Sequence, residues 1–389
     1  MTEPATQEVA ALRQNEDYCS SCSICSSLCP YEALKKDVET GRITLDITKC
    51  QVCGLCYSNC PASAIDILYY DLDSLIKYLE RAKQEYASDT LVIMCRGSAP
   101  DTAGVEEIFG VSKFIPLLVP CVGRIPDEIY LNALLMGIGK INVLACDEDY
   151  CRFDRGSSVT ARKIIALNLL LGQFGYEQEV ITLKRHSLKV KADANLCIAC
   201  GNCVFYCPYD AARLESPGGI NFDLAACRGC GLCVAMCPAV ALELENWEKD
   251  RISALITRLA PEMKPPKILV FRCQWATFPL LDEEPSPNVR FIDLPCAARV
   301  DNFHILEAFQ KGINGVLIAA CSEEDCKQNR ASGKTQHSMT ALSKRLSQIG
   351  FQERLHFCSV SPRYPEELDK ELEQFSQTIK AIGLKESNL

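Results

Sequence analysis

Short apolar runs recur at regular intervals in the first half of the chain. Three of them, at residues 90–95, 114–121 and 141–146, each end in a cysteine. Continuous apolar runs of this length are typical of strands buried on both faces of a parallel sheet. Because such strands alternate with helices, the runs predict a small α/β module whose thiols gather at the carboxyl edge of its sheet.

The second half of the chain repeats this pattern. Its apolar runs, which also end in cysteines, are residues 267–273, 289–296 and 315–321. Helical segments at 71–87 and 246–260 precede the two sets of runs, and a charged stretch at 183–195 joins the halves. From Pro365 onward the pattern predicts a polar amphipathic helix that ends in a loose tail.

Cysteine spacing shows that the whole chain is a tandem duplication. Cys19 to Cys29 recur at an offset of 178 residues, and Cys50 to Cys60 recur at an offset of 177. Cys95 recurs as Cys273 at an offset of 178. Three further cysteines recur at an offset of 175: Cys121, Cys146 and Cys151 return as Cys296, Cys321 and Cys326.

Composition limits the class of protein. A length of 389 residues suggests two to four compact units, and a net charge of -9 without a basic stretch disfavours nucleic acid as a partner. The N-terminus lacks the pattern of a secretory signal and no apolar stretch is long enough to span a membrane, so we expect a cytoplasmic protein without direct membrane insertion. In a reducing compartment, 25 cysteines indicate metal binding more than disulfides.

One cysteine motif occurs four times. It reads C-x2-C-x2-C-x3-C-P, and its cysteines are Cys19, Cys22, Cys25 and Cys29, then Cys50, Cys53, Cys56 and Cys60, then Cys197, Cys200, Cys203 and Cys207, then Cys227, Cys230, Cys233 and Cys237. Three closely spaced thiolates can wrap one cubane from a tight loop, whose backbone N–H groups offset the negative charge of the cluster.

The motif resembles that of bacterial two-cluster ferredoxins over about 55 residues in each half. The resemblance implies four 4Fe-4S clusters in which the fourth cysteine of each motif serves the neighbouring cluster. The implied ligand sets are Cys19, Cys22, Cys25 with Cys60; Cys50, Cys53, Cys56 with Cys29; Cys197, Cys200, Cys203 with Cys237; and Cys227, Cys230, Cys233 with Cys207. Structural zinc is a weaker alternative, because zinc sites need no third cysteine at this spacing.

The cysteines of the α/β modules form a second kind of candidate site. The intervals after Cys121 are 24 and then four residues, and the same intervals follow Cys296. The two quartets, Cys95, Cys121, Cys146, Cys151 and Cys273, Cys296, Cys321, Cys326, match the four thiolates that a 2Fe-2S cluster requires, so we expect one or two such clusters. Unmetallated buried cysteines, a zinc site and a redox dithiol remain alternatives.

Each α/β part resembles the delta subunit of methyl-viologen-reducing hydrogenase over roughly 100 residues. The residues that carry this resemblance are Cys273-Gln-Trp275, Pro295-Cys296-Ala-Ala-Arg299-Val-Asp301, the helix at 303–311 and Cys321-x4-Cys326 in the second half, with Pro120-Cys121-Val-Gly-Arg124 and Cys146-x4-Cys151 in the first. That family links a hydrogenase or formate dehydrogenase to heterodisulfide reductase. The resemblance thus implies a subunit of an anaerobic hetero-oligomer that contains a flavoprotein of the heterodisulfide reductase type and an electron-donating oxidoreductase.

Arg124 and Arg299 are cofactor-binding candidates. Each lies three residues after the second cysteine of its α/β quartet, where a cation stabilises the more negative reduced state of a cluster. A plain surface ion pair is the competing interpretation. We expect Trp275 and Cys358 to be packing residues and the acidic triplets at 147–149 and 323–325 to be solvated loops.

The predicted fold is α+β and α/β multidomain, with two ferredoxin-like modules at 1–70 and 186–246 alternating with two parallel-sheet α/β modules at 71–185 and 247–389. No motif for flavin, nicotinamide or nucleotide chemistry is present, so we predict no catalytic residue and an electron-transfer subunit. The alternatives are a ferredoxin-driven disulfide reductase that uses the Cys-x4-Cys pairs, and a redox-silent metal scaffold.

Overall fold

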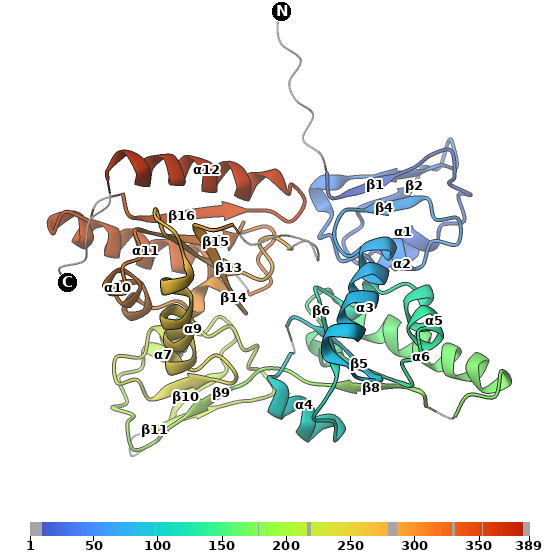
Figure 1. Cartoon of the computed structure of the whole chain (residues 1–389), viewed down its shortest axis with the longest axis horizontal. Coiled ribbons are helices and arrows are strands. Elements are labelled where there is room, and N and C mark those ends of the chain that lie inside the picture. The colour runs from blue at the N-terminus through green and yellow to red at the C-terminus, as the bar shows by residue number, and fades with distance from the viewer. Residues whose placement is uncertain are drawn as a thin grey trace, which may run out of the picture. The chain divides into compact units, whose positions relative to one another are not determined.

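The computed structural model describes residues 10–97, 99–177, 179–215, 219–278, 286–328, 331–351 and 353–383. The chain forms two compact units, residues 1–187 with 278–283, and residues 188–277 with 284–389 (Figure 1). The tail that the sequence predicts after the last helix lies at 384–389, outside the described residues. Within the described ranges, no helix is long and apolar enough to cross a bilayer.

The first unit begins with two short antiparallel strand pairs. Strand β1 (Leu12–Gln14) pairs with β4 (Ile65–Ile67), and β2 (Leu34–Lys36) pairs with β3 (Ile43–Leu45). Between the strands lie the one-turn helices α1 (Ile24–Leu28) and α2 (Leu55–Ser58), which pack against each other. Each helix directly follows a cysteine-containing loop, so this small framework holds the loops together.

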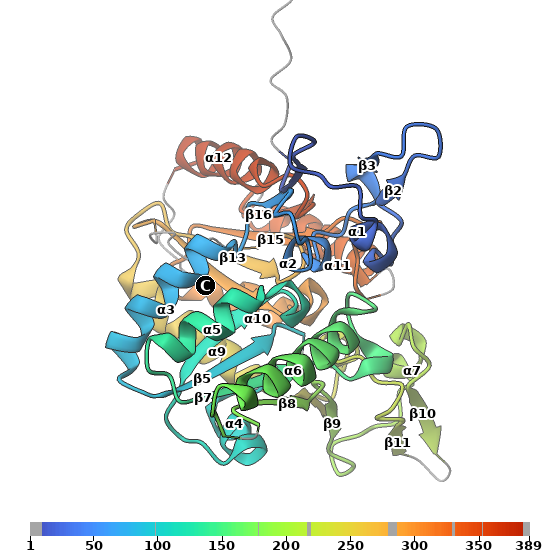
Figure 2. The same cartoon turned by 90° about the vertical axis from the view of Figure 1, so that its right-hand side faces the viewer.

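The α/β part of the first unit is a four-stranded parallel sheet. Its order is β6-β5-β7-β8, with β5 (Thr90–Cys95), β6 (Ile115–Val119), β7 (Lys140–Ala145) and β8 (Ile181–Arg185). The helices of this part are α3 (Leu72–Tyr86), α4 (Thr102–Phe109), α5 (Asp127–Leu135) and α6 (Gly156–Gln173), and α6 runs along β8 (Figure 2). Two short 3-10 helices, η2 (Val122–Arg124) and η3 (Glu148–Tyr150), follow β6 and β7. The predicted parallel sheet is confirmed.

The second unit repeats this architecture. Its strand pairs are β9 (Val190–Ala192) with β12 (Leu242–Leu244) and β10 (Ala212–Glu215) with β11 (Gly219–Phe222), beside helices α7 (Asn202–Tyr206) and α8 (Leu232–Ala235). Its sheet has the order β14-β13-β15-β16, with β13 (Ile268–Cys273), β14 (Val289–Leu294), β15 (Gly315–Cys321) and β16 (Leu355–Val360). The helices are α9 (Lys249–Glu262), α10 (Asn302–Gln310), η4 (Ala297–Arg299), α11 (Ala331–Gln348) and α12 (Glu366–Ala381), and α12 packs on β15 and β16 (Figure 1).

The charged stretch at 183–195 joins the two units, as the sequence predicts, because the boundary between them follows Ser187. It also contains the end of β8 and all of β9. Strand β8 is one of the two edge strands of its sheet, and its last residues, Lys184 and Arg185, are exposed.

Candidate metal centres

The backbone of all four cysteine loops has the same unusual conformation. In all four motifs the residues on both sides of the second cysteine have positive φ, whereas the cysteine does not; these residues are Ser21 and Ser23, Val52 and Gly54, Ala199 and Gly201, and Gly229 and Gly231. Such alternation turns successive N–H groups toward one point and favours a bound anion. The N–H group of Val52, for example, donates to the Cys50 Sγ atom at 3.4 Å.

The structure gathers the cysteines of three of the predicted ferredoxin quartets around separate cavities. One cavity is lined by Cys19, Cys22, Cys25 and Cys60, a second by Cys29, Cys50, Cys53 and Cys56, and a third by Cys197, Cys200, Cys203 and Cys237. In each of them the fourth cysteine comes from the neighbouring motif. The remaining cysteines also meet, because burial and then the charges of Cys230, Cys227 and Cys207 raise the pKa of Cys233.

We call the quartets that contain Cys22 and Cys200 the outer sites and those that contain Cys53 and Cys230 the inner sites. Cys22 and Cys200 are exposed, whereas Cys53 and Cys230 are buried. Each outer site thus reaches solvent through its second cysteine, whereas each inner site has three buried cysteines and one of intermediate exposure.

The α/β cysteines also converge, and we call the two quartets the sheet-edge sites. Hydrogen bonds with Cys121 and Cys146 raise the pKa of Cys95. Burial raises the pKa of Cys151 to about 12, and the charges of Cys121 and Cys146 add to the effect. These four thiols therefore lie together at the carboxyl ends of β5, β6 and β7, as the sequence predicts.

The second sheet-edge site has the same arrangement. The Sγ atoms of Cys273 and Cys321 are 4.0 Å apart. Hydrogen bonds with Cys296 and Cys321 lower the pKa of Cys273, and the hydrogen bond from Cys321 lowers the pKa of Cys326 to about 6. Cys326 therefore favours the thiolate that a metal cluster needs as its ligand.

The two sheet-edge sites differ at one helix. A Cβ atom added to Gly156, the first residue of α6, would lie 2.2 Å from the Cys121 Sγ atom. The equivalent residue at the start of α11 is Ala331, which is buried beside Cys296. The second sheet-edge site therefore has room for a methyl group at a position where the first site does not. The two sites thus differ in local packing.

The three sites of the first unit form a continuous row. Burial raises the pKa of Cys56 of the inner site, and charges that include that of Cys25 of the outer site raise it further. Burial also raises the pKa of Cys53, and the charge of Cys121 of the sheet-edge site adds to this increase. The inner site therefore lies within electrostatic reach of both neighbours.

The second unit has an equivalent row. The charge of Cys203 of its outer site acts on Cys233 of its inner site. The hydrogen bond with Cys273 and burial raise the pKa of Cys296, and the charge of Cys230 adds to this shift. Helix α8 of the inner site packs directly against η4, which follows Cys296.

Arg124 and Arg299 lie at the junction between inner and sheet-edge sites. Both side chains are 0% exposed, so the interpretation as a surface ion pair is wrong. A Cβ atom on Gly54 would lie 2.5 Å from the Arg124 Cβ atom, and one on Gly231 would lie 2.7 Å from the Arg299 Cδ atom. Each arginine therefore follows a sheet-edge cysteine and packs against the loop of the inner site.

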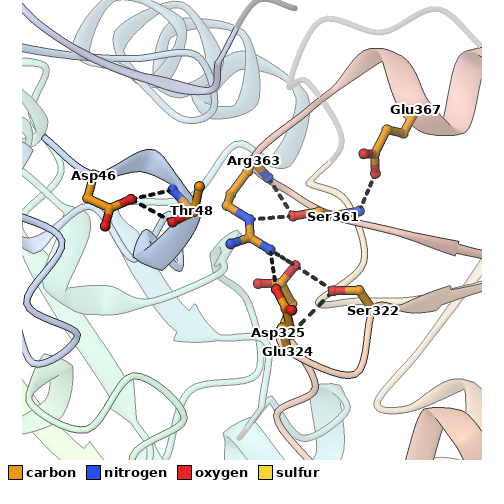
Figure 3. Close-up of polar contacts among 8 residues, drawn as sticks. All are labelled: Asp46, Thr48, Ser322, Glu324, Asp325, Ser361, Arg363 and Glu367. Carbon is orange, nitrogen blue, oxygen red and sulfur yellow. Dashed lines mark hydrogen bonds and ion pairs between the residues drawn. The ribbon is translucent and has the colours of Figure 1, made fainter.

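A buried ion pair that sequence reasoning missed holds the second Cys-x4-Cys loop. The Arg363 Nη2 atom lies 2.9 Å from the Asp325 Oδ2 atom, and the Arg363 Nε atom donates to the Ser361 Oγ atom at 3.0 Å (Figure 3). Ser322 donates to the same Asp325 oxygen at 2.8 Å. Asp325 is 1% exposed, so the expectation of a solvated acidic triplet is wrong at this residue.

Trp275 and Cys358 are both packing residues, as the sequence predicts. Trp275 is buried just after the end of β13, and Cys358 is buried in the middle of β16, opposite Ala319. Cys358 is separated along its strand from the carboxyl edge where the quartet gathers. It therefore packs as a small apolar side chain, as expected.

The donor set fits an iron–sulfur cluster better than a single ion. Each quartet consists of four thiols, and in a cubane each of four thiolates binds a different iron atom. The inward N–H groups and the buried arginines supply the positive charge that an anionic cluster requires.

Comparisons with known proteins agree with this picture. The profile of the 4Fe-4S dicluster domain matches residues 11–61 and 189–238, so the chain is an iron–sulfur protein with two dicluster domains. The profile described as methyl-viologen-reducing hydrogenase, delta subunit, matches residues 91–198 and 268–383. Because this match covers more than half of the chain, the protein belongs to that family.

Two individual relatives illustrate the similarity. Over 210 residues the chain is 31% identical to a subunit of the ferredoxin/F420H2-dependent CoB-CoM heterodisulfide reductase of Methanosarcina acetivorans, in a match that covers 52% of this chain and 26% of that protein. Over 125 residues it is 30% identical to the iron-sulfur subunit of the F420-non-reducing hydrogenase vhc of Methanococcus voltae, in a match that covers 30% of this chain and 87% of that protein. The first match thus spans about a quarter of the length of the heterodisulfide reductase protein.

Proposed function

We propose that this chain is an electron relay with four 4Fe-4S clusters in its inner and outer sites and a 2Fe-2S cluster in each sheet-edge site. The observation that carries the proposal is that cysteines from neighbouring ferredoxin motifs line common cavities in both units, as Cys60 does with Cys19, Cys22 and Cys25. When bound, the clusters supply one-electron uptake and release. The protein fixes their spacing, buries the inner sites and aims N–H groups at the thiolates.

The ligand sets of this proposal are the six cysteine quartets already defined, with the fourth cysteine exchanged between neighbouring ferredoxin motifs. The four-domain division at 1–70, 71–185, 186–246 and 247–389 is part of the same proposal. The matched relatives are named as subunits of heterodisulfide reductases and hydrogenases. We propose that this chain, too, acts in the cytoplasm between an electron-donating oxidoreductase and a flavoprotein of the heterodisulfide reductase type.

Anaerobic purification with iron and sulfide analysis, followed by low-temperature EPR, tests the cofactor content. The expected result is a brown protein with stoichiometric iron and sulfide and several one-electron signals. Colourless protein without sulfide would refute the relay. Anaerobic pull-down with identification of the bound proteins then tests the partners, and recovery of neither an oxidoreductase nor a flavoprotein would refute that part of the proposal.

A thiol–disulfide reductase is the second candidate. The observation that favours it is the hydrogen bond that joins the Cys321 and Cys326 thiols, which places the two sulfur atoms side by side. Such a thiol pair is typical of disulfide exchange. Alkylation of the metallated protein separates the two functions, because cluster ligands are protected and a catalytic dithiol reacts.

A further inference from the structure

Arg124 is a buried cation that faces sulfur and aromatic rings. Among the described residues, none of its three guanidinium nitrogens has a hydrogen-bond partner. Its Cζ atom lies 5.5 Å from the ring centre of Tyr70. Burial lowers its pKa, and the charges that oppose this shift are those of Tyr70, Cys121, Cys53 and Tyr57. Two of these four groups are candidate cluster ligands, one from each neighbouring site.

Arg299 occupies the equivalent position but has different partners. Its Nε atom donates to the Trp247 carbonyl oxygen at 2.8 Å, and its Nη2 atom lies 3.8 Å from the Glu243 Oε2 atom. Burial lowers its pKa too, but here the charges of Asp301, Glu243 and Glu248 oppose the shift more strongly than that of Cys233. The positive charge of Arg299 is therefore offset by carboxylates, whereas the charge of Arg124 is not.

We propose that Arg124 gives the inner and sheet-edge sites of the first unit a more positive reduction potential than their equivalents in the second unit, where carboxylates offset Arg299. This inference rests on the proposed electron relay. Reduction adds one negative charge to a cluster, and an adjacent cation stabilises that charge most strongly where solvent is excluded. The duplication has thus kept the cation in both halves and changed its countercharge.

The consequence is an order of reduction. At a given solution potential, the inner site of the first unit accepts an electron before the inner site of the second unit. A difference of one decade in the reduction equilibrium corresponds to about 59 mV for a one-electron centre. The two rows of sites would then serve as a lower-potential and a higher-potential segment of one relay.

EPR-monitored redox titration of the purified full-length protein tests this order. The variants are Arg124→Gln, Arg124→Lys and Glu243→Gln, and the matched control is Arg354→Gln. Arg354 is also buried, but it donates to the carbonyl oxygens of Asn314 and Gly383 and no cysteine is among these partners. We expect R124Q to lower at least one midpoint potential so that its reduction equilibrium shifts tenfold or more. R124K should shift it less, E243Q should raise a midpoint, and R354Q should leave all midpoints unchanged.

Separate outcomes distinguish the two proposals. Protein without reducible clusters would refute the electron relay itself. Protein with intact clusters whose midpoints do not move in R124Q and E243Q would overturn the role of Arg124 and leave the relay standing. If R124Q loses its clusters, the test relies on R124K, which keeps a cation, and on E243Q, which keeps a side chain of similar size. Unchanged midpoint potentials in both of these variants would again overturn the inference.

Discussion

Gly54 shows how one residue joins two parts of the first unit. Its φ of +81° is a backbone conformation that costs free energy in residues other than glycine. Because it lacks a side chain, Gly54 also leaves room for the Arg124 side chain. The sequence predicts a cluster loop here, but it does not show that this glycine also contacts an arginine 70 residues later. Such contacts arise only when the cluster loop packs against the sheet edge.

Substitution of Gly54 by alanine should therefore cost more than its backbone conformation alone requires. Gly41 is the matched control, because it has a φ of +70° with nothing within 4 Å of an added Cβ atom. We expect G41A to cost about 1–2 kcal/mol, and G54A to cost about 1–3 kcal/mol more through overpacking against Arg124. Thermal unfolding under anaerobic conditions measures both, and equal losses would show that the close approach has no energetic effect.

The sequence did not predict the surroundings of three residues: Arg124, Arg299 and Asp325. The spacing of the arginines after a cysteine suggested a role near a cofactor, but burial decided against a surface ion pair. Asp325 looked like part of a solvated acidic loop because its partner, Arg363, lies 38 residues away. No local pattern predicts that pairing, since it depends on how the segment after β16 returns to the loop after β15.

At the level of elements, the three apolar runs of each half were correctly predicted to be strands, although β6 and β14 end two residues before their cysteines. Two edge strands, β8 and β16, were not predicted as strands, whereas the other two edge strands, β6 and β14, were. Strand β8 carries lysine and arginine at its exposed end, so its sequence resembles a linker. Pairing with β7 determines its conformation, and pairing between distant strands is not visible in a single short segment.

The loops between the last two sheet-edge cysteines should differ in how strongly they depend on their ion pairs. In the second unit the pair of Arg363 with Asp325 is 6% and 1% exposed, whereas in the first unit the pair of Arg185 with Glu148 is 34% and 57% exposed. Removal of one partner from a buried pair costs roughly 3–5 kcal/mol, and from an exposed pair about 0–1 kcal/mol. We expect R363Q to lower the melting temperature markedly and to release iron faster, and R185Q to do neither.

Equal effects of the two substitutions would contradict this expectation. If R185Q and R363Q had the same small effect on melting temperature and iron release, the ion pair of the second unit would not hold its Cys-x4-Cys loop. In that case the hydrogen bond from Ser322 to Asp325 would have to be sufficient.

For the whole molecule, the exchange of fourth cysteines makes a sharp prediction. In C60S the outer site of the first unit should lose its cluster, so Cys19, Cys22 and Cys25 become open to alkylation. In C29S the inner site should lose its cluster instead, which exposes Cys50, Cys53 and Cys56. Mass spectrometry of anaerobically alkylated protein measures both, and C358S is the control. Loss of protection within the substituted cysteine's own motif in both variants would contradict the exchange.

The duplication itself was predictable from cysteine offsets, and the repeated strand order confirms it. What the offsets could not reveal is where the halves diverge. Gly156 corresponds to Ala331, and the surroundings of Arg124 differ from those of Arg299. These differences concern the residues that surround the thiols, which one sequence without its fold does not identify.

The exposure of Cys22 and Cys200 has a consequence for handling the protein in air. Dioxygen attacks iron–sulfur cubanes that it can reach, and Cys22 and Cys200, one in each row, are the cubane cysteines that are exposed to solvent rather than partly or wholly buried. Brief aeration should therefore bleach the protein in two stages, a fast loss of half its cubanes followed by a slow one. A molecule damaged in this way would keep its buried centres but lose the points at which other proteins can exchange electrons with it.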